Sequence, residues 1–374
     1  MQSGSSNFIQ NQSMNSTNLP FITRLCLHLV SIYILGLLIY AGADIIMPIC
    51  FAILLAMLLL PVVNWLIRRK LPDVLAIILA ILLATLFIGG IIYFLSSQVA
   101  SFMSDLPTIK QKLSQHISTL QGWINEQLNI SMKQQDAAVE SAKENIQNNP
   151  GGMGTALMGV AGTLVMLVLL PIYTFLLLYY RKLIRKFFLD VFSSRHKEQV
   201  EGVLSDSKTI VQGYMVGLLL ELAIVTVLNT VGFLVIGVEY AIFLGLLAAV
   251  LNLIPYIGML VATVICMAVT LTTSDNLSDV LWVGAILIVV QFIDNNFIMP
   301  YVVSTKVRIN ALVTIIGVLI GGALAGISGM FLSIPAIAIL KAIFDRVDSL
   351  KPWGLLLGDE QKKVGGKSSK KQKT

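Results

Sequence analysis

Residues 240–272 read YAIFLGLLAAVLNLIPYIGMLVATVICMAVTLT, a run without one charged side chain. The polar and turn-forming stretch Asn252-Leu253-Ile254-Pro255-Tyr256-Ile257-Gly258 interrupts this run in its middle. Each limb has about 15 residues, which as a helix spans roughly 23 Å and so falls short of the ~30 Å hydrocarbon core of a bilayer. We therefore predict that 240–272 forms a re-entrant helical hairpin.

A second apolar run, 311–344, has the same layout and is interrupted by the glycine-rich stretch 321–329, GGALAGISG. No Lys or Arg lies at either interruption to mark it as leaving the membrane. Irregular backbone at membrane depth is tolerated only where it is buried in protein or lines an aqueous cavity, as in a transport site. The sequence predicts a second hairpin here. The alternative in both places is a pair of short, tilted full spans.

The rest of the chain has the composition of a membrane protein. Hydrophobic residues make up 56% and charged residues 12% of the 374 residues, against about 25% charged in a soluble domain. The mean hydropathy is +0.84. Runs long enough to cross a bilayer as helices are 25–43, 45–67, 74–95, 155–180, 213–236 and 280–299. We predict an all-α polytopic membrane protein with about six full transmembrane helices and two re-entrant hairpins.

The positions of the basic residues predict the orientation. The net charge of +6 comes from clusters at 68–70, 181–186, 306–308 and 362–373, at the ends of predicted spans or in the C-terminal tail. With a cytoplasmic N-terminus, all but four of the 26 basic residues lie on the cytoplasmic side, as the positive-inside rule requires. We expect a multi-pass membrane protein with both termini cytoplasmic, and no nucleic-acid partner.

This orientation divides the chain into five parts. Residues 96–154 are predicted to be an extracytoplasmic insert, because apolar residues from Leu106 to Leu128 recur there at the steps of three and four typical of an amphipathic helix. The predicted parts are 1–95 (N-terminal tail and three transmembrane helices), 96–154 (the insert), 155–212 (fourth transmembrane helix and cytoplasmic interfacial helix), 213–344 (transport half) and 345–374 (basic cytoplasmic tail).

The transport half consists of a span followed by a hairpin, twice. With the predicted orientation, 213–236 crosses outward and 280–299 crosses inward, so the two units run in opposite senses. This is the layout of an inverted-topology repeat, in which substrate and ion sites lie near the bilayer midplane.

Two carboxylates fall inside predicted spans, Glu221 and Asp294. A charge within the membrane is costly and usually faces a cavity or a partner, so both are candidate ion-binding groups. Asp294 belongs to a polar cluster with Gln291 and Asn295. The alternative for Asp294 is a helix-end residue paired with a nearby basic side chain, and the alternative for Glu221 is a side chain that extends to the interface. The predicted substrate or ion path consists of Asn252, Pro255, Gly258, Glu221, Gln291, Asp294, Asn295, Gly326 and Gly329.

For the glycines and Pro255 the alternative is a tight turn with close helix packing. The three cysteines, Cys26, Cys50 and Cys266, lie inside apolar runs and suggest packing residues, with no disulfide framework or metal-binding spacing. We expect no metal, no cofactor and no catalytic residues, and we do not expect an enzyme.

The order of these motifs resembles a known family. Leu251-Asn252 followed by Pro255-Tyr256-Ile257-Gly258, then Gln291-x-x-Asp294 with Pro300, then the glycine-rich run to Gly329 and Pro335 is similar to the autoinducer-2 exporter (AI-2E) family of PerM-type permeases. A Glu-Gly pair is common in that family where this chain has Asp294-Asn295, a departure that keeps the acid and bears on substrate specificity. The resemblance implies homo-oligomers, in the form of ring-like pentamers, and transport of either small polar signals or monovalent cations.

These features favour a secondary transporter that exports a small polar solute, such as a signal of the autoinducer-2 type, by alternating-access movement of the hairpin-bearing half. The partners are then membrane lipid, the solute, and a proton or sodium ion. A monovalent cation (sodium or lithium)/proton antiporter is the first alternative, in which Glu221 or Asp294 exchanges protons for ions. A non-transporting membrane scaffold is the second.

Overall fold

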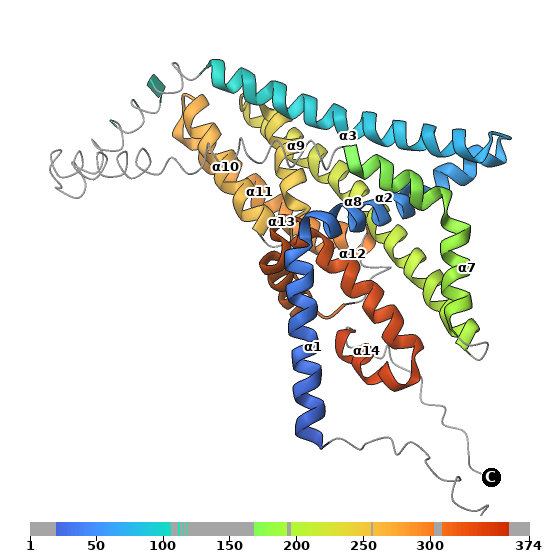
Figure 1. The fold of residues 1–374 in the computed structure, drawn as a ribbon. Coiled ribbons are helices and arrows are strands. Elements are labelled where there is room, and N and C mark those ends of the chain that lie inside the picture. The colour runs from blue at the N-terminus through green and yellow to red at the C-terminus, as the bar shows by residue number, and fades with distance from the viewer. Residues whose placement is uncertain are drawn as a thin grey trace, which may run out of the picture. The chain divides into compact units, whose positions relative to one another are not determined.

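The computed structural model of the chain describes residues 20–105, 111, 112, 115, 118, 168–192, 196–255, 257–302 and 309–358. Every regular element in these ranges is a helix, and one isolated bridge pairs Ile309 with Gly358. The chain divides into two units, 1–46 and 47–374. The predicted all-α class is confirmed (Figure 1).

The helices are named as in Figure 1. They are α1 (Phe21–Ala41), α2 (Ala43–Arg68), α3 (Asp73–Ser104), α7 (Arg181–Val191), α8 (Lys197–Ile236), α9 (Ala241–Asn252), α10 (Ile257–Thr273), α11 (Leu277–Ile293), the π-helical turn η2 (Asp294–Ile298), α12 (Met299–Val302), α13 (Ala311–Arg346), the 3-10 turn η3 (Asp348–Leu350) and α14 (Lys351–Leu357). A further apolar helix covers Val168–Tyr179.

Six of the described helical segments are long and apolar enough to cross a membrane: α1, α2, α3, α8, the segment Leu277–Val302 and α13. This confirms the polytopic membrane protein. Five of the six predicted spans coincide with these helices. Of the remaining one, 155–180, only the part from residue 168 lies within the described residues.

Helix α8 differs from the expected division of the chain. The sequence suggested an interfacial helix over 181–211 and a separate span from residue 213, but α8 continues for 40 residues, from Lys197 to Ile236. Only α7, an 11-residue helix, stands apart from it. No glycine or proline breaks the helix near residue 212, because Gly213 and Gly217 are accommodated within its regular turns. The membrane-crossing part of α8 is therefore joined rigidly to its polar N-terminal part.

The core of the second half is formed where α8, α9, α10 and α11 meet. Phe233, Leu244, Cys266 and Val283, one from each helix, are fully buried there. Cys266 is thus a packing residue, as expected. Gly245 brings α9 against α8 so closely that an added Cβ would lie 2.2 Å from Thr230 Oγ1. This tight packing fixes the position of the α9 C-terminus, where Asn252 lies.

Helices α9 and α10 follow each other through the turn at 253–255, and Gly258 makes the turn possible. A Cβ at Gly258 would lie 1.8 Å from the carbonyl oxygen of Leu251, so no side chain fits there. This close contact shows that Gly258 packs against the end of α9, and its place on the substrate path stays a prediction.

Helix α13 is also bent back on itself. Ala325 and Gly326 depart from helical geometry, and Gly326 has φ of +58°, which favours glycine. The limbs on the two sides of this bend lie so close that a Cβ on Gly321 would meet the Gly329 carbonyl oxygen at 2.3 Å, and a Cβ on Gly329 would meet that of Gly321 at 2.0 Å. The bend therefore lies where the sequence predicted a hairpin tip. That the limbs enter and leave one face of the membrane remains a prediction.

Candidate functional site

Two buried carboxyl groups and one amide meet where α8, α9 and η2 come together. Glu221 of α8 is 6% exposed and Asp294, the first residue of η2, is 2% exposed. Asn252, the last residue of α9, donates from its Nδ2 to Asp294 Oδ2 at 3.0 Å and to Glu221 Oε1 at 3.4 Å. The structure thus brings together three residues of the predicted path that are 31 and 42 positions apart in the chain.

The polar cluster around Asp294 extends this site along η2. Gln291 donates from its Nε2 to Asn295 Oδ1 at 3.0 Å and, more weakly, to Asp294 Oδ2 at 3.5 Å. The π-helical turn widens the helix at this point and interrupts the regular i to i−4 pattern, a feature found often at functional sites. Asp294 points inward as a result, while Asn295 is exposed.

Each acid has one carboxyl oxygen that the Asn252 amide does not reach. Glu221 Oε2 and Asp294 Oδ1 are buried and accept no hydrogen bond from another described residue, and the two carboxyl groups lie close enough for a hydrogen bond between them when one is protonated. None of the six ion pairs among the described residues includes either acid. Two ionised carboxylates this close together are strongly unfavourable in a buried site, which makes the pair a candidate for holding a proton or a cation. The alternative partners of Asp294, Lys306 and Arg308, lie outside the described residues.

A small cavity lies beside the pair. Its volume is about 10 Å³, close to that of one water molecule. Its lining comes from α8, α9, α10 and α11, and its polar residues are Asn229, Asn252 and Gln291. Asn229 is 2% exposed and its Oδ1 has no hydrogen-bond partner. It was not among the predicted site residues, although an Asn two turns after Glu221 in an apolar helix was a signal for it.

Helix α8 carries the buried polar residues of this region on one face. Ser207, Tyr214, Glu221 and Asn229 follow at intervals of seven or eight residues, and each is at most 7% exposed. Intervals of seven or eight residues correspond to about two helical turns, so the four side chains point to the same side. This polar stripe begins in the polar N-terminal part of α8 and reaches the cavity.

The remaining predicted path residues lie elsewhere. Pro255 and Gly258 are in the α9–α10 turn, next along the chain to Asn252. Gly326 and Gly329 are in the α13 bend, and no hydrogen bond among the described residues joins that bend to the two acids. Leu253 of the α9–α10 turn and Phe331 of the second α13 limb both border the apolar cluster that Ile334 forms with residues of α8, so the turn and this limb share one cluster.

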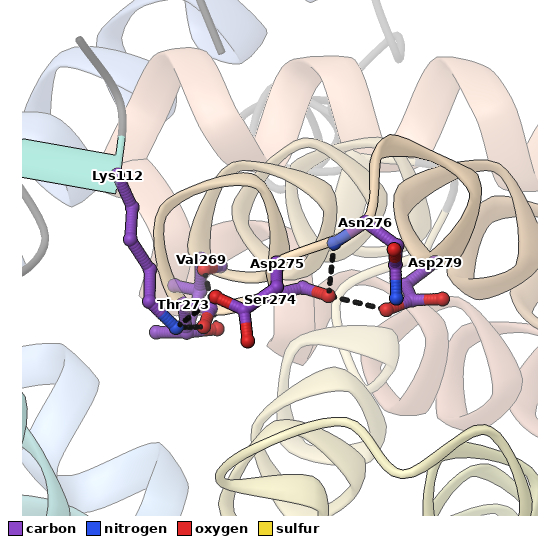
Figure 2. A network of polar contacts seen from close by, with 7 residues as sticks. All are labelled: Lys112, Val269, Thr273, Ser274, Asp275, Asn276 and Asp279. Carbon is purple, nitrogen blue, oxygen red and sulfur yellow. Dashed lines mark hydrogen bonds and ion pairs between the residues drawn. The ribbon is translucent and has the colours of Figure 1, made fainter. Parts of the chain in front are cut away.

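A second polar network lies around the turn between α10 and α11, and Figure 2 shows its members. Lys112 pairs with Asp275 at 3.0 Å and donates to the Thr273 carbonyl, while Ser274 donates to Asp279 and accepts from the Asn276 backbone (Figure 2). A lysine at the C-terminus of α10 is favourable because it meets the carbonyl end of the helix dipole. This network fixes a turn, and Asp275 is largely exposed, so it is no candidate binding site.

A further contact ties α9 to the end of α3. The Tyr240 hydroxyl donates to the Asp105 carboxylate, and this hydrogen bond raises the pKa of Tyr240 to about 12. Among the described residues no group of three or more His, Cys, Asp or Glu side chains is placed to hold a metal ion. Within the part of the chain that the structure describes, Glu221 and Asp294 are the only acidic or basic side chains that are buried.

Comparison with known proteins identifies the relatives of this chain. The family model described as "AI-2E family transporter" matches residues 27–349. The Bacillus subtilis (strain 168) protein named "Putative transport protein YrrI" is 28% identical over 303 residues, which cover 79% of this chain and 84% of that protein. The "AI-2 transport protein TqsA" of Escherichia coli (strain K12) is 25% identical over 331 residues, covering 86% and 91% of the two chains.

Proposed function

Since the chain belongs to the AI-2E family of transporters, we propose that it is a secondary transporter that exports a small polar solute and whose Glu221–Asp294 pair is the coupling site. The observation that carries this proposal is the pair itself: two buried acids, bridged by one amide, whose carboxyl groups lie close enough for a hydrogen bond when one is protonated. Such a site stays electrically balanced only by taking up a proton or a cation.

The proposed coupling follows from that balance. When the pair holds a proton, one acid donates and the other accepts, and the site loses a negative charge. When the proton leaves, a monovalent cation replaces it, because two carboxylates cannot both stay ionised and unpaired in a dry interior. Exchange of the proton for the cation at opposite faces of the membrane would drive the solute against its gradient.

Asn252 would transmit this exchange to the α9–α10 hairpin. Its side chain contacts both acids, and its backbone is the last turn of α9. A change of charge at the pair alters the strength of these two hydrogen bonds, since bonds to ionised groups are stronger than bonds to neutral ones. We propose that the hairpin moves with that change and opens the path alternately to the two sides.

The remaining parts of the proposal come from sequence and family. Both termini would be cytoplasmic, in a bacterial inner membrane, and the protein would act as a homo-oligomer, with the pentamer implied by the family resemblance. The name of TqsA refers to AI-2, which makes a small signal of that type the first solute to test.

A second candidate is a monovalent cation/proton antiporter, in which the cation is itself the cargo. The acidic pair favours this candidate, because two buried carboxyl groups joined by one amide can exchange a proton for a monovalent cation without any organic solute.

Purified protein in liposomes separates these candidates. We expect efflux of autoinducer-2 that depends on an imposed proton or sodium gradient, or, for the second candidate, sodium-dependent proton movement without any solute. A pH-sensitive dye in the lumen reports the proton in both cases. Absence of all these fluxes from protein that is folded and correctly inserted would contradict a transport function.

A further inference from the structure

We propose that basic side chains at the end of α2 and on α7 together form a binding site for an anionic phospholipid. The ligand is the phosphodiester headgroup of a lipid of the bilayer, such as phosphatidylglycerol. The site, here called the basic patch, consists of Arg68, Arg69, Lys70, Arg181, Lys182 and Lys186. It is independent of the transport proposal, because none of these residues belongs to the acidic pair or lines the cavity.

The two segments of the basic patch meet in the fold. The helix Val168–Tyr179, which leads into α7, packs through Leu178 against Val63 of α2 and Ile77 of α3. Arg181, the first residue of α7, donates from Nη1 to Asn64 Oδ1 at 3.5 Å, across 117 positions of the chain. Asn64 lies about one helical turn before Arg68. The basic end of α2 and the basic start of α7 are therefore neighbours.

Most cations of the basic patch have no partner within the protein. Four of them are exposed and make no side-chain hydrogen bond or ion pair with any described residue, namely Arg68, Lys70, Lys182 and Lys186. The one acid of α7, Asp190, lies 4.0 Å from Lys197 and not beside the patch cations. Like charges gathered in one place are stabilised by an anion between them, so the patch favours a negatively charged ligand.

An exposed apolar face of α7 adjoins these lysines. Leu183, Phe187 and Val191 follow at intervals of four residues and are 62%, 60% and 59% exposed. Lys182 and Lys186 directly precede the first two of them, so the lysines border the apolar face along one side. A helix with this arrangement lies in the surface of a bilayer, with its apolar face among acyl chains and its lysines extended to the phosphates.

Aromatic side chains mark the level of the bilayer surface beside the basic patch. Tyr179 and Tyr180, at the junction of the apolar helix with α7, and Trp65, over whose ring the Arg69 guanidinium lies, are all exposed. Exposed Tyr and Trp side chains gather at the headgroup level of membranes. Figure 1 shows α7 turning away from the helix before it at this junction. The basic patch thus lies where lipid phosphates are, which makes a lipid its occupant.

Binding is measured without transport, on the detergent-purified full chain with added lipid. Ligands that bind only the folded state raise the melting temperature. We expect phosphatidylglycerol to raise it by at least about 3 °C over an equal amount of phosphatidylcholine at low ionic strength. High salt should reduce this difference, because exposed charges are screened. Inorganic phosphate at equal ionic strength should give no rise, because it has no acyl chain to contact α7.

The double variant Lys182→Gln/Lys186→Gln should lose most of the difference between the two lipids. Lys208→Gln/Lys351→Gln is the matched control, since it removes two exposed lysines outside the basic patch and should keep the difference. Lys182→Arg/Lys186→Arg retains both charges and should keep it as well. Each variant is compared with itself in the two lipids, so a change in its own stability does not enter the result.

Three results would overturn this inference. Equal melting temperatures of the unaltered protein in the two lipids would show that it has no preference for an anionic headgroup. An equal loss in the control variant would show that net charge, and not the basic patch, attracts the lipid. A rise of the same size with inorganic phosphate would show that a free anion occupies the patch. None of these results bears on transport, which is tested by flux.

Discussion

Asn252 holds the two acids in a single site, because one amide nitrogen donates to both of them. No other described side chain contacts both Glu221 and Asp294 through a hydrogen bond. A hydrogen bond to a charged group contributes about 1.5–3 kcal/mol. The amide therefore holds both acids next to the end of α9, which is the contact on which the proposed coupling rests.

We predict that Asn252→Ala lowers transport in liposomes by about tenfold or more, because at least one hydrogen bond to a charged group is lost. Expression and oligomer size should stay near those of the unaltered protein. Asn276→Ala is the matched control, since Asn276 is exposed and its side chain caps no helix. Equal flux in the two variants would show that the bridge does not take part in coupling.

At the scale of the element, the glycines of the α13 bend are required for two different reasons. Around Gly321 and Gly329 the backbones of the α13 limbs touch, whereas the space around Gly326 is open and only its positive φ requires glycine. Gly326 has φ of +58° and ψ of −141°, a region open essentially to glycine alone, where another residue costs about 1–3 kcal/mol, while a Cβ against backbone forces the limbs apart.

Two alanine substitutions separate these effects. Gly326→Ala should lower the melting temperature by the amount expected for about 1–3 kcal/mol of backbone strain and leave the oligomer intact. Gly321→Ala should reduce stability further, because a Cβ there would lie 2.3 Å from the Gly329 carbonyl oxygen. The reverse order of stability in thermal unfolding would show that the limbs are not packed as described.

The elements also show how far sequence reasoning reaches. Apolar runs and their interruptions predicted the helices, the turn after Asn252 and the bend near Gly326, because burial and backbone freedom are local properties of the chain. The sequence placed Glu221, Asn252 and Asp294 on one predicted path, but it did not predict that their side chains are in contact. The π-helical turn at Asp294 and the continuity of α8 had no local signal strong enough, since they depend on packing between helices far apart in the sequence.

At the scale of the whole molecule, the orientation in the membrane decides which side each part of the path faces. We predict that a single cysteine at position 136, in a chain whose three native cysteines are replaced, reacts with an impermeant thiol reagent added to intact cells. A cysteine at position 365 should react only after lysis. The prediction rests on the distribution of basic residues. The reverse pattern would invert the orientation and the direction of transport inferred from it.

The charge of the acidic pair is the feature on which the whole account depends. Removing an unpaired buried charge should leave stability unchanged or raise it, so loss of function in such a variant reports on the mechanism and not on folding. Glu239→Gln removes an exposed acid by the same chemical change and serves as the matched control.

The most direct test is therefore gradient-driven flux through Asp294→Asn protein reconstituted in liposomes. We predict that flux falls to the level of empty liposomes while the melting temperature and the oligomer size are kept, and that Glu239→Gln transports normally. Flux in Asp294→Asn equal to that of the unaltered protein, under the same gradient, would contradict coupling through the Glu221–Asp294 pair.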